Sequence, residues 1–363
     1  MCCTHRLKPP ETGTLSNLKD NAVPIQFRSE KLEARSVTPD GSQTKARSVE
    51  VRFDPLLGTT SRIAHGVKLQ TADPEAVKKF QLPDASCPFC ADRIEKVTPC
   101  IDPKVSKERR IRVGETVLFP NLVPYSQYAA VAAFTSRHWL AVDEFSPKLI
   151  ADNLAACIRY IRTVHAFDAR ARYCAWNINY LFPSGGSLPH PHAQAFLDPF
   201  PTTMMRFQFE AAERYWRANG TNYWEDLATT ERARNERFAW DIGSTSWMTA
   251  FAPIGFNEVR AVVRGRETLL QLDDADVAAI ASGTSRVLQW YRALGYDSFN
   301  LTLFSAPLEG SPSFRVNLVM VTRTAMLPYY RSDAMHLERL HWEAAVDRAP
   351  EIAAAELRTG FST

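Results

Sequence analysis

Residues 185–194 read Gly-Gly-Ser-Leu-Pro-His-Pro-His-Ala-Gln, a Gly/Ser turn followed by alternating residues that run into an apolar stretch. Successive side chains of a β-strand point to opposite faces, so this spacing predicts that His190 and His192 lie side by side on one face of a strand. Gln194 follows on the same face. Two neighbouring imidazoles allow a division of roles, in which one ring binds a metal ion and the other attacks phosphorus.

The chain also repeats one order of secondary structure. The first half has predicted strands on both sides of one helix, which begins at Ser146 and Pro147. The second half repeats this order around a helix that is capped by Asp273 or Asp274 and stopped by Gly295. The predicted strands span residues 116–119, 129–134, 173–181, 190–196, 247–251, 258–263, 298–304 and 314–321. This order predicts an α+β fold with an internal duplication.

A chain of 363 residues is long enough for two modest domains or one large two-lobed domain. Residues 1–48 are polar, rich in Lys, Ser, Thr and Pro, and show no sustained period, which predicts a flexible N-terminal arm. We expect a catalytic lobe over residues 49–200. Residues 201–363 are then a C-terminal pseudo-repeat lobe with a helical tail.

The composition excludes several classes of partner. A formal net charge of +3 is too small to indicate nucleic-acid binding. No apolar run approaches the roughly 20 residues that a membrane span requires, and the N-terminus lacks the apolar core of a signal peptide. Seven cysteines are an odd number and are widely spread, which is not typical of a disulfide framework. We therefore expect a cytoplasmic protein without membrane or nucleic-acid partners.

Cys87 and Cys90 form a Cys-x-x-Cys pair. In a cytoplasmic chain such a pair is half of a zinc site, a redox pair or a chance occurrence. A zinc ion needs two further ligands to complete a tetrahedron. A redox pair is expected to open a helix after a strand, and the residues that follow Cys90 do not exclude this. The spacing alone leaves these interpretations open.

The Gly-Gly-Ser-Leu-Pro-His-Pro-His-Ala-Gln motif resembles the active-site motif of galactose-1-phosphate uridylyltransferases, a branch of the histidine-triad superfamily. In that family the motif usually contains Ser-Asn-Pro-His-Pro-His-Gly-Gln, so Leu188 and Ala193 depart from it. The resemblance covers most of the chain from about residue 52 onward. It implies tandem histidine-triad-like repeats, two mainly antiparallel sheets with packed helices and, by analogy, a homodimer.

The resemblance also implies a metal site. The corresponding family segments read Cys-x-x-Cys, Ser-Pro-x-His and the first histidine of His-Pro-His, which match Cys87, Cys90, His138 and His190 here. A Cys2His2 set leaves no open position on zinc, so we expect one structural Zn²⁺ ion. The histidines of a second, C-terminal metal site that some members carry are absent, and we expect no second site.

The resemblance assigns catalysis to His192 and Gln194. A neutral nitrogen of His192 is expected to attack the α-phosphorus of a nucleotide ester, which gives a nucleotidyl-histidine that a second phosphate then resolves. The other ring nitrogen is expected to donate to a backbone carbonyl. Histidine-triad hydrolases have a further histidine where this chain has Gln194. An amide cannot shuttle a proton but can donate a hydrogen bond to a phosphoryl oxygen, which favours transfer over hydrolysis.

The substrate-binding residues follow from the glycine turn and from the resemblance. Paired glycines let backbone N–H groups approach phosphate oxygens, and two asparagines match family residues that contact the nucleotide. The Asp that often follows one of them is Leu122 here, which weakens an assignment of uridine. The expected binding residues are Asn121, Asn179, Ser184, Gly185, Gly186 and Ser187.

These observations predict a nucleotidyltransferase that moves a nucleoside monophosphate between a nucleotide sugar, or a related nucleotide ester, and a phosphate acceptor. Of the family's hexose-contacting Lys-Phe-x-x-Gly-Tyr-Glu segment only Glu338 remains, so galactose 1-phosphate is not the expected acceptor. One alternative is a phosphorylase or hydrolase of a nucleoside diphosphate sugar or dinucleoside polyphosphate on the same scaffold. Another is a non-catalytic nucleotide-binding protein. The base, the sugar and the acceptor stay open.

Overall fold

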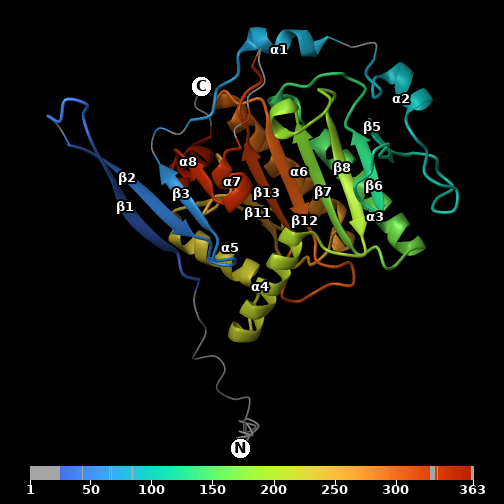
Figure 1. The fold of residues 1–363 in the computed structure, drawn as a ribbon. Helices are drawn as coiled ribbons and strands as arrows, with labels where there is room; N and C mark the ends of the chain where they lie inside the picture. The colour runs from blue at the N-terminus through green and yellow to red at the C-terminus, as the bar shows by residue number, and fades with distance from the viewer. Residues whose placement is uncertain are drawn as a thin grey trace, which may run out of the picture.

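The structure, a computed structural model, describes residues 25–42, 44–64, 66, 68–82, 86–327, 332 and 334–360. These residues form one ten-stranded sheet and one four-stranded sheet with helices packed on them (Figure 1). All strand pairs are antiparallel except β3 (Thr60–Ala64) with β14 (Ala344–Val346), which is parallel. The predicted α+β class with two mainly antiparallel sheets is therefore confirmed.

The ten-stranded sheet is made of two halves that follow the same order along the chain: three strands, a helix and two strands. The first half consists of β4 (Ile111–Val113), β5 (Thr116–Pro120), β6 (Tyr128–Ala133), α3 (Pro147–Phe167), β7 (Tyr173–Tyr180) and β8 (His192–Asp198). The second half consists of β9 (Phe238–Ile242), β10 (Thr245–Thr249), β11 (Val259–Val263), α6 (Asp274–Ala293), β12 (Phe299–Phe304) and β13 (Asn317–Thr322). The two repeats therefore do not form one sheet each, because both contribute five strands to the large sheet.

The two halves are joined where β7 pairs with β12, and their registers correspond. Asn177 of β7 and Thr302 of β12 face each other across this join. On its other side Asn177 pairs with Gln194 of β8, and Thr302 pairs in the same way with Val319 of β13. The spatial order is β4-β5-β6-β8-β7-β12-β13-β11-β10-β9. From each edge of the sheet to the β7–β12 join, the strands of a half therefore follow in the same order: first, second, third, fifth and fourth.

Helices α3 and α6 pack against one face of this sheet and against each other, and they enclose most of the hydrophobic core. The hydroxyl of Ser146 caps α3 and the carboxylate of Asp273 caps α6, as the sequence predicts, because each accepts a backbone N–H of the first turn. Gly283 allows α6 to lie close to the sheet, since a Cβ there would stand 2.1 Å from the indole of Trp247.

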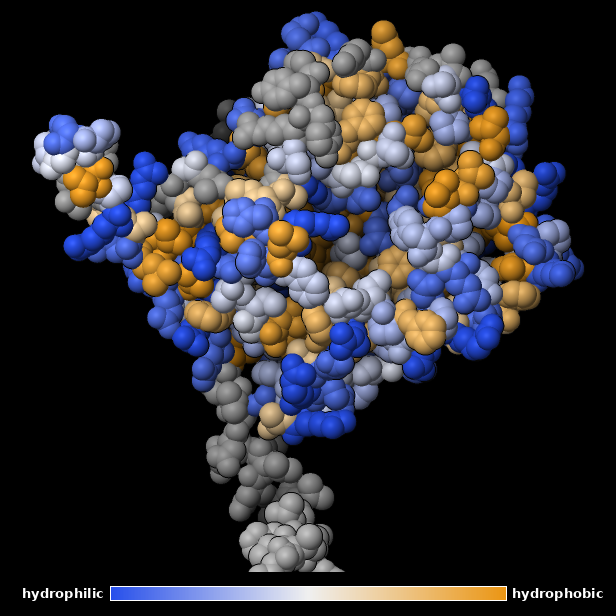
Figure 2. Space-filling model, in the orientation of Figure 1, coloured by the Kyte–Doolittle hydropathy of each residue, from blue (hydrophilic) through white to orange (hydrophobic). Residues whose placement is uncertain are grey.

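The opposite face of the sheet is covered by different elements in the two halves. Over the second half, α4 (Thr203–Asn219) and α5 (Tyr223–Arg234) cover it, and Trp224 packs with Met248 and Val262. The corresponding face of the first half lies beside α2 (Ala91–Val97) and carries the cavity described below. Figure 2 shows that this side of the molecule is hollowed near its middle.

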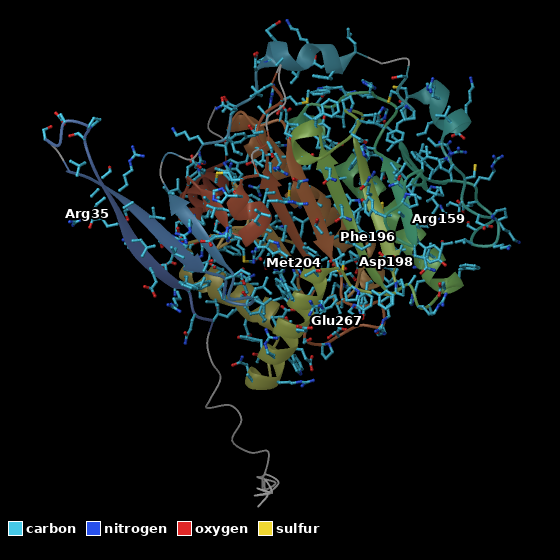
Figure 3. All side chains as sticks on the ribbon, viewed as in Figure 1. Arg35, Arg159, Phe196, Asp198, Met204 and Glu267 are labelled. Carbon is cyan, nitrogen blue, oxygen red and sulfur yellow. The ribbon has the colours of Figure 1, made fainter. Side chains whose placement is uncertain are left out.

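The expected N-terminal arm is corrected in part. Residues 1–24 and 43 lie outside the described residues, but β1 (Arg28–Val37) and β2 (Thr44–Phe53) pair antiparallel along their full length. With β3 and β14 they form the four-stranded sheet, and their hairpin projects from the body, with Arg35 near its far end (Figures 1 and 3). Pro39-Asp40-Gly41 marks its turn, and Gly41 has φ +70°. The strand pattern is weak because exposed charged residues occupy both faces of β1.

The expected helical tail is present but interrupted. α7 (His336–His341) and α8 (Pro350–Thr359) flank β14, which joins the four-stranded sheet. α1 (Pro74–Gln81) precedes the Cys-x-x-Cys loop. Short 3-10 helices are Val142–Glu144, Phe182–Ser184 and Leu269–Gln271. Among the described residues, no helix combines the length and apolar character that crossing a membrane requires.

Candidate functional site

The four predicted metal ligands come together from three separate segments. Cys87 and Cys90 precede α2, of which Cys90 is the N-cap; His138 follows β6, and His190 precedes β8. One donor atom of each residue lies within 4.8 Å of the others. All four are buried except Cys90, which is partly buried. The convergence of two imidazoles on both sulfurs favours a metal site over a redox pair.

The spacing of the donor atoms fits a tetrahedral ion. The Sγ of Cys87 lies 3.7 Å from the Nδ1 of His190, and the Sγ of Cys90 lies 3.3 Å from the Nδ1 of His138 and 3.8 Å from that of His190. With Zn–S bonds of about 2.3 Å and Zn–N bonds of about 2.0 Å, tetrahedral angles give S–N separations of roughly 3.5 Å. The residues present therefore fit a metal ion held by Cys2His2.

His190 is oriented for this role by the backbone. Its Nε2–H donates to the carbonyl oxygen of Thr135 at 2.9 Å, so its Nδ1 faces the sulfurs. Burial lowers the pKa of His190 to about 4, which keeps the ring in the neutral form that binds metals.

His192 is held by a different contact. It begins β8, and its Nδ1–H donates to the carbonyl oxygen of His190 at 2.8 Å, as expected for a fixed tautomer. The lone pair is then on Nε2. Only 7% of His192 is exposed, and burial lowers its pKa, so the ring is neutral at neutral pH. The ring of Phe89 meets it edge-on, with centroids 5.3 Å apart.

A cavity of about 430 Å³ lies on the same face, beside the beginning of β8. Figure 3 labels Phe196 and Asp198 near the other end of this strand. His192 does not line the cavity, but Phe89, which its ring contacts, and Gln194, two residues further along the same face, both do. Its walls are largely apolar, with three side-chain amides and several loop residues. The lining residues are Pro88, Phe89, Val97, Thr98, Pro99, Phe119, Asn121, Leu122, Val123, Tyr125, Val131, Asn179, Gly185, Ser187, Leu188 and Gln194.

Two of the residues predicted to bind substrate do not line this cavity. Ser184 is buried, and its hydroxyl donates to the carbonyl oxygen of Leu181 at 2.7 Å. Gly186 packs so closely that a Cβ would lie 2.9 Å from the carbonyl oxygens of both Asn179 and Leu181. These contacts give both residues a part in shaping the loop, whereas Gly185 and Ser187 lie at the cavity.

Two of the three amide side chains at the cavity, Asn179 and Gln194, have their oxygen engaged by another side chain. The Oδ1 of Asn179 accepts a hydrogen bond from Asn300 at 2.7 Å, and the Oε1 of Gln194 accepts one from the hydroxyl of Tyr125. An engaged oxygen leaves the NH2 group of each amide as the donor for a ligand. Asn300 and Tyr125 were not predicted from the sequence, since neither belongs to a motif.

Asn121 shapes the loop that carries Tyr125. Its Oδ1 accepts the backbone N–H of Val123 at 3.1 Å, an Asx turn that places Leu122 and Val123 at the cavity with large exposed surfaces. The expected contact of Asn121 with a nucleoside stays a prediction.

The second half has the same sheet geometry without the chemistry. Asn317, two residues before Val319, takes the place that His192 has two residues before Gln194. The face there is filled by Arg260, which pairs with Asp54 at 3.2 Å and with Glu258 at 2.5 Å. The remaining cavity is about 70 Å³, and α4 lies over it, with Met204 labelled in Figure 3.

Comparison with known proteins identifies the family and the fold. No family model matches the chain. A protein of Archaeoglobus fulgidus without an assigned function is 33% identical over 340 residues, which span 93% of this chain and 99% of that protein. The chain belongs to the same family as this archaeal protein.

Solved structures extend the comparison to the fold. A galactose-1-phosphate uridylyltransferase-like protein of Arabidopsis thaliana matches with a TM-score of 0.68 at 17% identity, covering 86% of this chain and 99% of that chain. An ADP-glucose phosphorylase of Arabidopsis thaliana, with bound ADP-glucose, gives 0.66 at 18% identity, covering 85% and 98%. A uridylyltransferase gives 0.63 at 18% identity, covering 85% and 97%. The chain therefore has the uridylyltransferase-like fold that the motif implied.

Proposed function

We propose that this protein is a zinc-containing nucleotidyltransferase. It moves a nucleoside monophosphate from a nucleotide sugar, or a related nucleotide ester, to a phosphate acceptor through His192. The observation that carries the proposal is the state of this ring: it is neutral, its Nδ1–H is bound to the carbonyl oxygen of His190, and it lies beside a cavity with amide donors. A buried neutral imidazole with one free lone pair is a nucleophile.

The reaction then has two steps. The Nε2 of His192 attacks the α-phosphorus, and the bond from phosphorus to the bridging oxygen breaks, so the leaving group departs as a phosphate ester. A phosphate oxygen of the acceptor next attacks the same phosphorus, the nitrogen–phosphorus bond breaks, and the neutral ring returns. Throughout, the carbonyl oxygen of His190 accepts from Nδ1–H and stabilises the charge on the substituted imidazole.

Gln194 supports transfer over hydrolysis within this proposal. Its NH2 group donates to a nonbridging oxygen of the transferred phosphate, but an amide does not carry a proton between a water molecule and a leaving group. Phosphorolysis differs from transfer only in the acceptor, which is then inorganic phosphate. It is the second candidate, because a structure of the same fold is described as an ADP-glucose phosphorylase.

Zn²⁺ is the proposed occupant of the site made by Cys87, Cys90, His138 and His190. It would hold the start of β8 against the loop of Cys87 and Cys90, so that the ring of His192 keeps its orientation. It would take no part in making or breaking bonds. The sulfur ligands require a reducing compartment, and the described cysteines are free thiols, so we place the protein in the cytoplasm. A homodimer is proposed by analogy.

Intact-mass spectrometry after exposure to a panel of nucleoside diphosphate sugars and dinucleoside polyphosphates tests the proposal. We expect a gain of one nucleoside monophosphate, which names the nucleotide, and no gain for His192→Gly. Adding sugar phosphates or inorganic phosphate then separates transfer from phosphorolysis. Release of free monophosphate without an acceptor would indicate a hydrolase. Binding without adduct or turnover across the panel would leave the nucleotide-binding alternative.

A further inference from the structure

The hydroxyl of Tyr125 donates a hydrogen bond to the Oε1 of Gln194, although the two residues are far apart in sequence. Tyr125 lies in the loop between β5 and β6, outside the histidine motif. It lines the cavity together with Gln194, and 69% of its surface is exposed. The contact therefore lies at the mouth of the cavity and contributes little to the core.

The side chain of Gln194 has no other hydrogen bond among the residues that the structure describes. Asn177, its neighbour on β7, donates to the backbone carbonyl oxygen of Gln194 at 3.4 Å and so fixes the strand. On the other side, β6 presents Val131, which is apolar. The orientation of the amide about its last bond thus depends on Tyr125.

The two ends of an amide have opposite effects on a phosphate. The NH2 group donates to a phosphoryl oxygen, whereas the carbonyl oxygen repels it. In the structure the hydroxyl of Tyr125 donates to the carbonyl end, and in this orientation the NH2 group of Gln194 is left for the ligand. We infer that Tyr125 is a positioning residue that turns the amide of Gln194 toward the transferred phosphate. This inference rests on the proposed function, in which Gln194 binds that phosphate.

Tyr125→Phe removes the hydroxyl and keeps the ring. We expect roughly fivefold slower formation of the nucleotidyl-enzyme, the order that loss of one neutral hydrogen bond gives. In a Gln194→Ala background the same substitution should have no further effect, because the amide through which it acts is gone. Tyr128→Phe is the matched control. It removes a hydroxyl that donates to Asp168 at 3.2 Å, and it should leave the rate unchanged. The thermal midpoint should not change in Tyr125→Phe.

A wild-type rate in Tyr125→Phe, or an equal loss with and without Gln194, would overturn the inference and leave the proposed function standing. If the wild-type protein forms no adduct with any nucleotide, the proposed function fails. The amide orientation is then decided by the ¹⁵N-resolved NH2 signals of Gln194, assigned by their loss in Gln194→Ala. We expect these signals to shift or broaden in Tyr125→Phe but not in Tyr128→Phe. Unchanged signals would overturn the inference on their own.

Discussion

The side-chain amide of Asn300 donates a hydrogen bond of 2.7 Å to the side-chain oxygen of Asn179. The two residues face each other across the β7–β12 join, so a residue of the second repeat orients a residue of the first. Asn300 in turn accepts a hydrogen bond from Arg323 at 2.8 Å. The second repeat, which lacks the histidine pair, thus still helps to shape the cavity by orienting Asn179.

Replacing Asn300 with Ala should free the amide of Asn179 to turn and lower nucleotide affinity by roughly five- to tenfold, the effect of one hydrogen bond. Titration calorimetry with the nucleoside monophosphate found by mass spectrometry measures this. Thr302→Val is the control, because Thr302 donates to Asn177 at 3.0 Å and does not contact Asn179. Equal losses in both variants would contradict a specific role for Asn300.

Cys87→Ser should lower zinc content and stability together, since a Cys2His2 ion loses one of four ligands. We expect less than one zinc per chain by elemental analysis. The thermal midpoint should fall by about 5 °C or more. Cys100→Ser is the control, because the Sγ of Cys100 contacts Arg109 at 3.3 Å, away from the other sulfurs. Unchanged zinc and stability in Cys87→Ser would refute the metal assignment.

Gly186→Ala should disturb the cavity, because the added Cβ would meet two carbonyl oxygens at 2.9 Å, one of them that of Asn179. A displacement of a few tenths of an ångström to 1 Å at a reacting group costs roughly 10- to 100-fold in rate. Single-turnover measurements of adduct formation test this. Gly283→Ala gives a closer clash, 2.1 Å from the indole of Trp247, on the face that α3 and α6 cover, and should lower the thermal midpoint with little effect on nucleotide binding.

Asp297→Asn should raise stability at neutral pH. Among the described residues neither carboxylate oxygen has a hydrogen-bond partner of ordinary geometry, and burial raises the pKa of Asp297 from 3.8 to about 6. The folded state therefore favours the protonated form; its contribution is complete below about pH 4 and is lost as pH rises through 6. The variant should exceed the wild type above pH 6 by up to about 3 kcal/mol, with no difference near pH 4.

Urea unfolding from pH 4 to 8 measures this difference, and Asp276→Asn gives a control of opposite sign. Burial alone would raise the pKa of Asp276, but hydrogen bonds from Ser244 and Arg266, together with the backbone bond to Asp273, lower it overall. Its charged form is stabilising at neutral pH, so the variant should be less stable there. A lower stability of Asp297→Asn at pH 7 would contradict the buried-charge argument.

The sequence predicts the elements and contacts that short-range patterns encode. The caps Ser146 and Asp273 and the repeated element order follow from local spacing, and both are present. The metal residues Cys87 and His190 are 103 positions apart, and the known family pattern, not their spacing, identified them as partners.

Other features depend on contacts between segments that the sequence does not reveal. Asn300 reaches Asn179 because β12 pairs with β7, and Tyr125 reaches Gln194 because the loop between β5 and β6 folds back over β8. The placement of Ser184 behind the cavity depends on its hydrogen bond to Leu181, which no motif specifies. The hairpin was missed because charges cover both faces of β1, although its Pro-Asp-Gly turn was a usable signal.

The β7–β12 join lies at the centre of the large sheet, with five strands on either side. Cutting the chain between the repeats would expose the backbone groups of an interior strand in each fragment, and such bare edges drive aggregation. The two halves are consequently not interchangeable modules. A truncated protein that keeps only the histidine motif would lose Asn300 along with its folding partner, so the second repeat is structurally required although it lacks the histidine pair.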